Sequence, residues 1–510
     1  MALPSARRAL VGVAGALVFG VLVTANSAGY RFGAADQAFY VPAIERALDP
    51  GLFPRDRVLI DAQARWLWLD EGTAWLVRAT GVGLPTVLFA GYVLSTALVA
   101  VGLYLMGRGL VFTAPTVVAF GAAITLRHRV AGTGVNTFEG MFHPRILAFG
   151  LGLVAVAALL HRRRAVAIVA VACAAAVHPT TALWFALWIA TAIAVTDARV
   201  PAWLPAGCTV VGGVGLWLLA RAGLVPFERM DDAWLSVLDQ KAYLFPSRWV
   251  PDAWLTGALP IVVTLAVYRW RARRTLAAPP ERGLVAGLML LVAVFVGTLP
   301  LVEDRGAWFV QLQIPRVLWL VEVAATAYLA WWLGEAVRPG RRAAPWRPMA
   351  LATLLVLASL GRGGYVMLVE HPERPLVALD LAPGPWRDVG AWVARATPPH
   401  AHVLADPGHA WRYGLSFRVT ARRDVLVEEV KDAAIAIYSR AAATRVRDRT
   451  QSVGDFSALT PERVRALARR YDLDYFVDTR VFPFPVVHRA GPFVVYAIGE
   501  GAPPTDARRR

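Results

Sequence analysis

Long apolar stretches, separated by short polar segments, fill roughly the first 370 residues. A helix needs about 20 apolar residues to cross about 30 Å of hydrocarbon, and most of these stretches are close to that length. The pattern therefore predicts a multi-pass α-helical membrane protein with about 11 transmembrane helices. The predicted spans are 9–28, 83–106, 111–126, 144–160, 165–178, 179–196, 202–221, 253–268, 283–300, 316–336 and 348–367.

Residues 165–196 can be read as one long kinked helix or as two short spans that meet at His178-Pro179. Proline breaks a helix because it lacks a backbone N–H and clashes with the preceding turn. A single helix would also move the basic segments 269–274 and 338–347 to the outer side of the membrane. Two spans are therefore the better prediction.

Arginine-rich segments recur in every second loop, which fixes the predicted orientation. Short loops rich in Lys and Arg stay in the cytoplasm. With Arg7 and Arg8 inside, the other basic loops also fall inside: Arg108, His161–Arg164, Arg199, Arg269–Arg274 and Arg338–Arg347. We therefore expect a plasma-membrane protein with a cytoplasmic N-terminus. The segments expected outside are 29–82, 127–143, 222–252, 301–315 and everything after about residue 370.

The residues after 370 change from long apolar runs to short alternating elements. An amphipathic helix is predicted at 386–396, and a second begins after Thr460, with Thr460 as its N-cap and Pro461 at its first position. Short strands are predicted at 402–405, 425–428, 475–478 and 493–496. The chain thus divides into a transmembrane domain, 1–369, with a first outer loop, 29–82, and an extracytoplasmic α/β or α+β domain, 370–510. That domain is expected to be a lid, a partner-binding surface or a structural cap.

Composition agrees with this class and excludes others. The chain is 57% hydrophobic, and its net charge of +17 comes mostly from arginine, with only Lys241 and Lys431 as lysines. This bias is typical of a GC-rich bacterial genome. Because much of the basic excess lies in short loops, no nucleic-acid partner is expected. Cys173 and Cys208 lie inside apolar segments, which leaves no disulfide framework or zinc cluster.

The first outer loop begins with the stretch G-A-A-D-Q-A-F-Y-V-P, residues 33–42. Phe39 to Leu48 carries apolar residues at helical spacing, which predicts a short interfacial helix. Trp66, Trp68 and Trp75 then follow as membrane-surface anchors. Asp36 lies at the start of this helix, where it can act as a general base, hold a cation or cap the helix. Local sequence leaves these alternatives open.

Several short motifs together resemble the GT-C superfamily of integral-membrane glycosyltransferases, in a bacterial branch. They are G-x-x-D-Q-x-x-Y-x-P, Asp49-Pro50, Leu52-Phe53-Pro54-Arg55-Asp56, His143-Pro144 and His178-Pro179. The resemblance implies transfer of a sugar from a polyprenyl-phosphate or pyrophosphate donor to a lipid, glycan or protein acceptor on the outer face. Asp36 matches the acid that acts as base or metal ligand in that superfamily. Members often carry a second adjacent acid, and here that neighbour is Gln37. No metal ligands are therefore assigned, and a divalent cation is the one cofactor left open.

A lipid-phosphate donor requires cations near the outer membrane surface, and arginine matches phosphate oxygens well. The predicted topology places Arg145, Arg305 and Arg316 at outer ends of spans, and His143 and His178 at helix starts. We assign these five residues to donor binding, together with Gln37 and Tyr40 beside Asp36. The alternative for the arginines is snorkelling to the lipid headgroups or pairing with Glu139, Glu303 or Asp304. The alternative for the histidines is to satisfy backbone groups beside the prolines.

Some acidic residues that are not assigned to donor binding have more than one possible role. Asp70-Glu71 either supplies a second acid or forms a solvated turn that ends at Gly72. The acids and aromatics of 222–252, among them Asp231 and Trp234, fit a sugar site or an interfacial belt. Glu322 lies inside a predicted span, where a charge needs a partner that the sequence does not reveal.

The leading hypothesis is a membrane glycosyltransferase in which Asp36 accepts the proton of the acceptor. The rival hypotheses are a transporter or flippase and a non-catalytic GT-C-like scaffold that binds lipid-linked sugar. Transporters often contain internal repeats, and no convincing repeat is present here.

Overall fold

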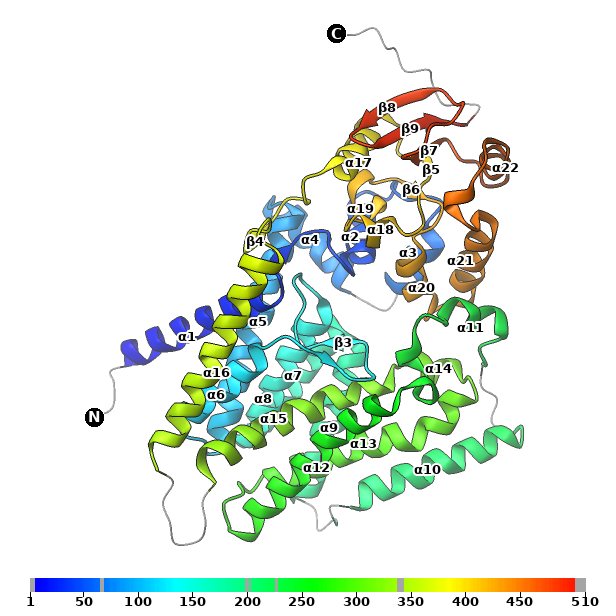
Figure 1. The fold of residues 1–510 in the computed structure, drawn as a ribbon. Coiled ribbons are helices and arrows are strands. Elements are labelled where there is room, and N and C mark those ends of the chain that lie inside the picture. Colours follow the sequence, from blue (N-terminus) through cyan, green and yellow to red (C-terminus); the bar gives the residue numbers. More distant parts are fainter. Residues whose placement is uncertain are drawn as a thin grey trace. The chain divides into compact units, whose positions relative to one another are not determined.

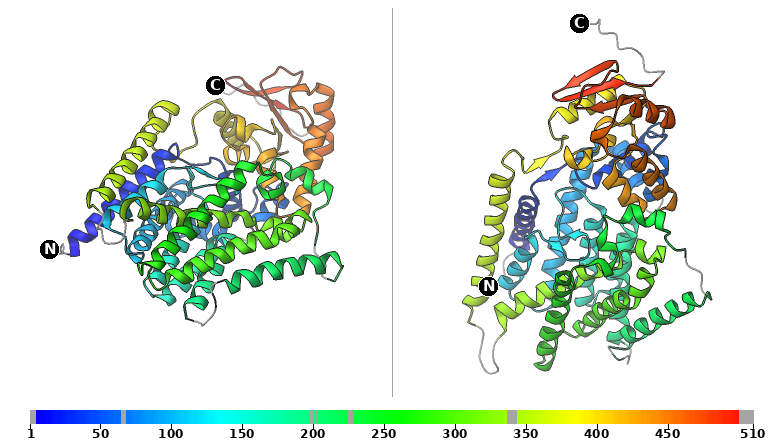
Figure 2. Two further views of the ribbon diagram at one scale, coloured as in Figure 1. Left: turned by 60° about the horizontal axis from the view of Figure 1, so that its bottom comes forward. Right: turned by 45° about the vertical axis from the view of Figure 1, so that its right-hand side comes forward.

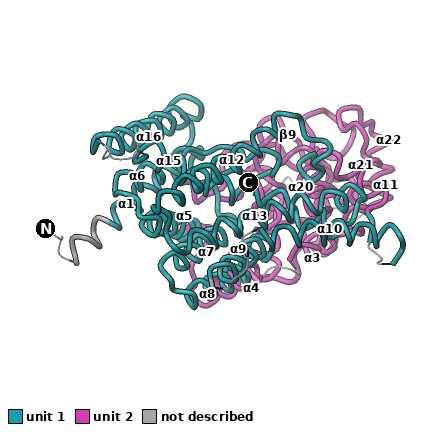
Figure 3. Tube along the Cα trace, turned by 90° about the horizontal axis from the view of Figure 1, so that it is seen from below, with its two compact units in different colours: residues 1–30, 90–229, 241–377 teal, residues 31–89, 230–240, 378–510 magenta. Residues whose placement is uncertain are grey.

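The computed structural model describes residues 5–64, 68–197, 201, 203–224, 228–336 and 344–499. The chain forms two compact units, coloured separately in Figure 3. The first, here the helical unit, comprises Met1–Tyr30, Ala90–Arg229 and Lys241–Val377. The second, here the sheet unit, comprises Arg31–Phe89, Met230–Gln240 and Ala378–Arg510. The sheet unit thus includes most of residues 29–82, the predicted first outer loop, as well as the C-terminal region.

Apolar helices make up the helical unit (Figure 1). In its described part, seven helical segments are long and apolar enough to cross a membrane, and four shorter apolar helices accompany them. The chain is therefore a membrane protein with a mostly helical fold. Its helices are α1 (Ser5–Asn26), α5 (Leu84–Gly109, which starts in the sheet unit), α6 (Ala114–Thr125), α7 (Pro144–Leu160), α8 (Arg164–Val177), α9 (Pro179–Asp197), α10 (Leu204–Arg221), α12 (Pro251–Arg273), α13 (Glu281–Glu303), α14 (Ala307–Gln311), α15 (Val317–Glu335) and α16 (Trp346–Tyr365).

Each predicted span coincides with one of these helices, and the break at His178-Pro179 is confirmed. Helix α8 ends at Val177, and α9 begins at Pro179. His178 between them has extended backbone angles, so the two segments are separate helices. The eleven crossings and their orientation stay predictions. Trp66, Arg199 and 338–343 of the last basic loop lie outside the described residues.

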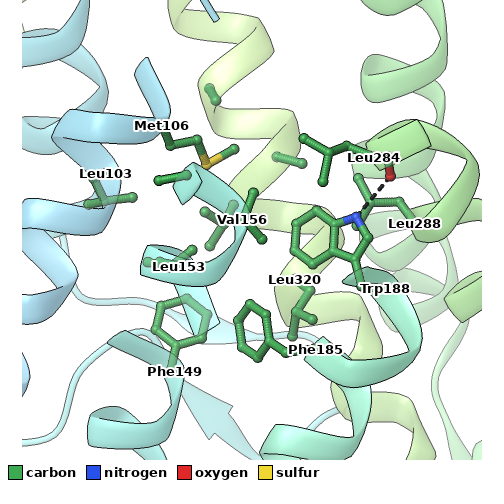
Figure 4. Close-up of a cluster of buried hydrophobic side chains, with 14 of the residues drawn as sticks. Leu103, Met106, Phe149, Leu153, Val156, Phe185, Trp188, Leu284, Leu288 and Leu320 are labelled. Carbon is green, nitrogen blue, oxygen red and sulfur yellow. Dashed lines mark hydrogen bonds between the residues drawn. The ribbon is translucent and has the colours of Figure 1, made fainter. Parts of the chain in front are cut away.

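Large side chains from α5, α7, α9, α13 and α15 fill the core of the helical unit. Figure 4 shows Phe149, Phe185 and Trp188 among leucines of neighbouring helices. The indole N–H of Trp188 donates to the carbonyl oxygen of Leu284 at 2.8 Å. Glycines let the helices approach closely: a Cβ on Gly287 would lie 2.5 Å from Cδ1 of Trp188. Small residues at such contacts are typical of helix packing in membranes.

A five-stranded mixed sheet forms the centre of the sheet unit, with strand order β6-β5-β7-β9-β8. Strand β5 is parallel to β6 and β7, whereas β9 is antiparallel to β7 and β8. Successive residues point to opposite faces, so Val403 and Val477 lie in one hydrophobic cluster and Leu404 and Phe476 in another. The strands are β5 (His402–Leu404), β6 (Asp424–Val425), β7 (Tyr475–Asp478), β8 (Val486–Ala490) and β9 (Phe493–Ala497).

Helices from three parts of the sequence complete the sheet unit (Figure 2). The predicted helix at 386–396 is confirmed as α17 (Pro385–Ala396). The predicted N-cap role of Thr460 is also confirmed, because its Oγ1 atom accepts a hydrogen bond from the Arg463 N–H at 3.3 Å. Strand β8 was not predicted, and β6 is shorter than the predicted 425–428. The other helices are α2 (Gln37–Leu48), α3 (Arg57–Ala64), α4 (Leu69–Thr80), α11 (Asp232–Leu238), α18 (His409–Arg412), α19 (Phe417–Ala421), α20 (Glu429–Ala436), α21 (Arg440–Val453) and α22 (Pro461–Tyr471).

Candidate functional site

Two histidines of the helical unit lie close together where helices begin. The Nδ1 atom of His143 accepts a hydrogen bond from the Arg145 N–H at 3.1 Å and so caps α7. The Nδ1 atom of His178 accepts from the Thr181 N–H at 3.3 Å at the start of α9. The ring centroids are 6.3 Å apart. Because each Nδ1 is an acceptor, the proton of each neutral ring resides on Nε2, which is then a donor.

Arginine side chains surround this histidine pair. Arg145 is 4% exposed and donates from Nη2 to Oε1 of Glu139 at 3.4 Å. Arg127 lies 3.9 Å from the other oxygen of Glu139, so two guanidinium groups share one carboxylate. The Nε atom of Arg145 is buried without a hydrogen-bond partner in the described part of the chain. The predicted alternative of pairing with Glu139 is thus confirmed for Arg145, which shares this carboxylate with Arg127.

Arg316 adds a third positive charge from a different helix. It ends a short 3-10 helix (Ile314–Arg316) directly before α15 and is partly buried. Both Arg316 and Arg145 act electrostatically on His178. We call Arg127, Arg145, Arg316, His143 and His178 the cationic cluster. Four of the predicted donor-binding residues therefore meet in one region of the helical unit.

Arg305 is exposed and follows the C-terminal end of α13 in a left-handed backbone conformation. The two acids at the C-terminal end of α13 each accept a hydrogen bond from another residue. Glu303 accepts from the hydroxyl of Ser247 at 2.6 Å, and Asp304 accepts from the indole N–H of Trp217 at 2.6 Å. A role for Arg305 in donor binding stays a prediction.

Glu322, whose partner the sequence did not reveal, pairs with Nε2 of His128. His128 lies in the loop that follows α6, just before the hairpin of β2 (Arg129–Val130) and β3 (Val135–Asn136). The hydrogen bond to Glu322 raises the pKa of His128, although burial opposes the rise. Arg362 of α16 donates to the carbonyl oxygen of Asn26 at 2.9 Å. Glu322 and Arg362 therefore both have hydrogen-bond partners within the helical unit.

Asp36 lies in the sheet unit and forms an ion pair that the sequence did not predict. The Nζ atom of Lys431, which belongs to α20, donates to Oδ1 of Asp36 at 3.0 Å. The Asp36 side chain is 37% exposed. It occupies the N-cap position of α2, but its side chain makes no capping hydrogen bond in the described structure. The helix-capping alternative is therefore wrong, because the carboxylate points to Lys431 instead.

Gln37 and Tyr40, predicted to bind substrate, are buried within the sheet unit. The side-chain oxygen of Gln37 accepts from the Gly33 N–H at 2.7 Å and so fixes the turn before α2. The ring of Tyr40 lies edge-on to Phe39, with 4.6 Å between centroids. These contacts hold the segment that carries Asp36.

Sequence reasoning missed a buried ion network around Asp56, the last residue of the Leu52-Phe53-Pro54-Arg55-Asp56 motif. Asp56 is fully buried and accepts from Nε of Arg418 at 2.7 Å and from Arg445. Arg449 lies 3.6 Å away. Arg418 also binds both oxygens of Asp432, at 2.6 and 3.0 Å. We call these five residues the Asp56 network. The only signal in the sequence was the motif itself.

The Asp56 network ties residues 55 and 56 to the edge of the sheet. The backbone N–H groups of Arg55 and Asp56 donate to the two oxygens of Asp424 at 3.0 and 2.9 Å, and Asp56 accepts from the Val425 N–H at 3.2 Å. Burial alone would raise the pKa of Asp56, but the guanidinium groups of Arg418, Arg445 and Arg449 hold it well below its usual range. Burial and the charge of Asp56 raise the pKa of Asp424 to about 6.

Asp70-Glu71 is not the solvated turn considered from the sequence. Both residues lie in the first turn of α4, and Asp70 is only 2% exposed. Burial, followed by the negative charge of Glu71, raises the pKa of Asp70 to about 8. The local sequence hid this because the packing partners of α4 are set by the tertiary fold. Trp68, directly before α4, and Trp75 within it are exposed, as membrane anchors would be.

Trp234 and Asp231 of the segment 222–252 form structural contacts within the sheet unit. Trp234 is buried in the sheet unit, where its indole N–H donates to the carbonyl oxygen of Ala436 at 2.8 Å. Asp231 caps α11 by accepting from the Trp234 N–H at 2.8 Å. Trp234 is therefore a core residue of that unit.

Within the described ranges, no three His, Cys, Asp or Glu side chains are grouped as metal ligands.

Comparison with known proteins gives a match to solved structures but none to family models or curated proteins. Among solved structures, the chain is similar to the oligosaccharyltransferase of Archaeoglobus fulgidus, in a crystal structure with a tethered acceptor peptide that contains the NVT sequon. The match has 13% identity and a TM-score of 0.45, and it covers 92% of this chain and 69% of that chain. At this level of similarity the match carries no argument about the function, substrates or residue roles of this chain.

Proposed function

We propose that this protein is a membrane glycosyltransferase of the GT-C type, which transfers a sugar from a polyprenyl-phosphate donor to an acceptor on the outer face of the bacterial plasma membrane. The observation that carries the proposal is the cationic cluster. Three arginines and two imidazoles gather near the ends of apolar helices, and Glu139 pairs with two of the arginines, Arg127 and Arg145. Such a concentration of positive charge in a membrane protein is costly unless it serves an anion.

A phosphate group linked to a lipid fits this cluster. Arginine binds phosphate oxygens through charge-assisted hydrogen bonds, and the Nε2–H of each histidine adds a neutral donor. The buried Nε–H of Arg145 has no acceptor among the described residues, so a phosphate oxygen would satisfy it. Donors aimed at a leaving phosphate stabilise the charge that develops as the sugar departs.

In the proposed reaction, an oxygen atom of the acceptor attacks the anomeric carbon of the sugar. A new carbon–oxygen bond forms while the bond between the anomeric carbon and the phosphate oxygen breaks. The lipid phosphate leaves with the electron pair, and the anomeric centre inverts. The proton of the acceptor passes to the carboxylate of Asp36, the role that the motif resemblance implies. The ion pair with Lys431 would orient that carboxylate.

The same ion pair favours a second candidate, a non-catalytic scaffold that binds lipid-linked sugar. A carboxylate that is engaged by Lys431 at 3.0 Å has a structural role already. In that case the cationic cluster would bind the donor without turnover.

The test uses the full-length protein in lipid nanodiscs with synthetic polyprenyl-phosphate hexoses and pentoses, and with lipid, glycan and peptide acceptors. Product formation, donor hydrolysis and donor binding are measured for each variant. Asp36→Asn should abolish transfer while donor binding is retained. Arg145→Gln should weaken donor binding about tenfold or more, because charged hydrogen bonds contribute about 1.5–3 kcal/mol.

Two matched variants serve as controls. Asp61→Asn removes an exposed, ion-paired carboxylate of α3, and Arg129→Gln removes an exposed arginine of the loop that carries His143. Both should behave as wild type. Normal transfer by Asp36→Asn would remove Asp36 from the chemistry. Donor binding without transfer or hydrolysis for every donor and acceptor would favour the scaffold.

A further inference from the structure

A small cleft lies within the sheet unit, between helices α11, α20 and α21. Its volume is about 170 Å³. The residues that line it are Ser236, Val237, Gln240, Glu429, Ala433, Val446, Arg447, Thr450 and Gln451. None of them belongs to the cationic cluster or the Asp56 network. Pockets for drug-sized ligands span about 300–1,000 Å³, so this cleft suits a single small ring.

The cleft has an apolar floor and a polar rim. Ala433 and Val446 are buried, and Val237 is partly buried beside them. Ser236, Gln240, Arg447 and Gln451 are exposed around this floor, and Glu429 is half-buried. The amides and hydroxyls of the rim both donate and accept hydrogen bonds. One acid and one arginine balance each other, so the rim has no net charge.

Two hydrogen-bonding groups at the cleft are poorly satisfied. The hydroxyl oxygen of Thr450 is buried and has no hydrogen-bond partner among the described residues. The amide of Gln240 reaches Oε1 of Glu429 only at 3.5 Å, the long limit of a hydrogen bond. Since buried polar groups are normally hydrogen-bonded, a bound ligand with hydroxyl groups would complete these contacts.

The walls of the cleft are held by specific contacts. Trp234 anchors α11 on the carbonyl oxygen of Ala436. The guanidinium Nε of Arg440, on α21, donates to Asp231 at 3.0 Å, although this pair is exposed. The buried tryptophan therefore fixes α11 against α20, and the cleft is a built feature of the sheet unit.

We infer that this cleft binds one neutral sugar residue of a glycan. A hexopyranose ring has a face of C–H groups and a rim of hydroxyls, which matches the apolar floor and the polar rim without net charge. Each hydroxyl donates and accepts, as do the Gln, Ser and Thr side chains here. The inference concerns binding by the sheet unit and does not depend on the transfer reaction.

The experiment uses the full-length protein in lipid nanodiscs, because sugar-based detergents would occupy the site. Saturation-transfer NMR and calorimetry are run with methyl glycosides of neutral hexoses and pentoses, and with an unglycosylated extended peptide as the competing ligand class. At least one methyl glycoside should bind, and Gln240→Ala and Thr450→Val should each weaken it about two- to tenfold, the range for one neutral hydrogen bond.

The matched control is Thr444→Val, which makes the same change at an exposed position of α21. It should leave binding unchanged. The inference fails if no glycoside binds the wild type, if the peptide binds in place of every glycoside, or if Thr450→Val and Thr444→Val bind alike. Sugar transfer by a protein with an empty cleft would overturn this inference while leaving the proposed function intact.

Discussion

The Asp56 network offers the sharpest test of how the sheet unit is held together. We consider Asp56→Ala, which removes the carboxylate and leaves Arg418, Arg445 and Arg449 without their shared partner. Asp432 still neutralises Arg418, but the other two guanidinium groups lose their closest negative charge. Removal of one partner from a buried ion pair costs about 3–5 kcal/mol, because the remaining charge stays buried.

This cost converts into a measurable thermal shift. For folded units of about 150–250 residues, 1 kcal/mol corresponds to about 2–4 °C in the melting temperature. Asp56→Ala should therefore melt about 6–20 °C below the wild type. Asp56→Asn keeps an acceptor for the Val425 N–H, so its melting temperature should decrease less than that of Asp56→Ala. Asp61→Ala, which breaks an exposed pair with Arg57, should cost less than about 1 kcal/mol.

The assay is thermal unfolding of the full-length protein in nanodiscs, followed by hydrogen exchange of the β5 and β6 amides. The pH dependence gives a second test. Since the pKa of Asp56 is lowered in the folded state, its ionised carboxylate contributes to the free energy of unfolding above about pH 4. This contribution is lost as the pH falls further. The wild type should therefore approach Asp56→Asn in acid. A melting temperature of Asp56→Ala within 2 °C of the wild type at pH 7 would refute the reasoning.

Three further predictions follow from single residues. The pKa of Asp70 is raised to about 8 in the folded state, so the stability of the fold decreases as the pH rises from about 4 to about 8. Asp70→Asn should remove this pH dependence and melt at a higher temperature than the wild type at pH 8.5. An unchanged pH profile of the melting temperature would contradict this prediction. Gly287→Ala places a Cβ 2.5 Å from Trp188 and should cost about 1–3 kcal/mol, whereas Gly212→Ala, with open space around it, should be neutral or stabilising in the same melting assay. Thr460→Ala removes the cap of α22 and should cost about 1 kcal/mol, measured against Thr444→Val; equal melting temperatures would show that the cap contributes nothing.

Local signals explain what the sequence could predict. Apolar length located the helices, Pro179 located the break between α8 and α9, and Thr460 with Pro461 located the start of α22. In each case the deciding residues lie within one turn or one span of the feature. Strand β8 was missed because its residues are mostly exposed or half-exposed and include His488 and Arg489, so its sequence lacks a buried alternating pattern.

Distant partners explain what the sequence could not predict. Asp56 and Arg418 are 362 residues apart, Asp36 and Lys431 are 395 apart, and His128 and Glu322 are 194 apart. No periodicity or cap connects such positions, because the tertiary fold alone brings them together. Four residues of the cationic cluster could be predicted from the topology, because each lies beside the end of an apolar span. Their mutual distances still required the structure.

Asp36 and Asp56, in the loop of residues 29–82, form ion pairs that give the C-terminal region a definite physical role. Asp36 and Asp56 both belong to motifs of that loop, and both depend on cations that follow the last predicted span: Lys431 for Asp36, and Arg418, Arg445 and Arg449 for Asp56. Burial of Asp56 without these cations would be prohibitively costly, so residues 55 and 56 cannot keep their position without the C-terminal sheet. The region after 378 is therefore a scaffold that holds the segment carrying Asp36. It follows that deletion of this region would disorder the loop whether or not it contacts a substrate, and only point variants such as Lys431→Met can separate support from chemistry.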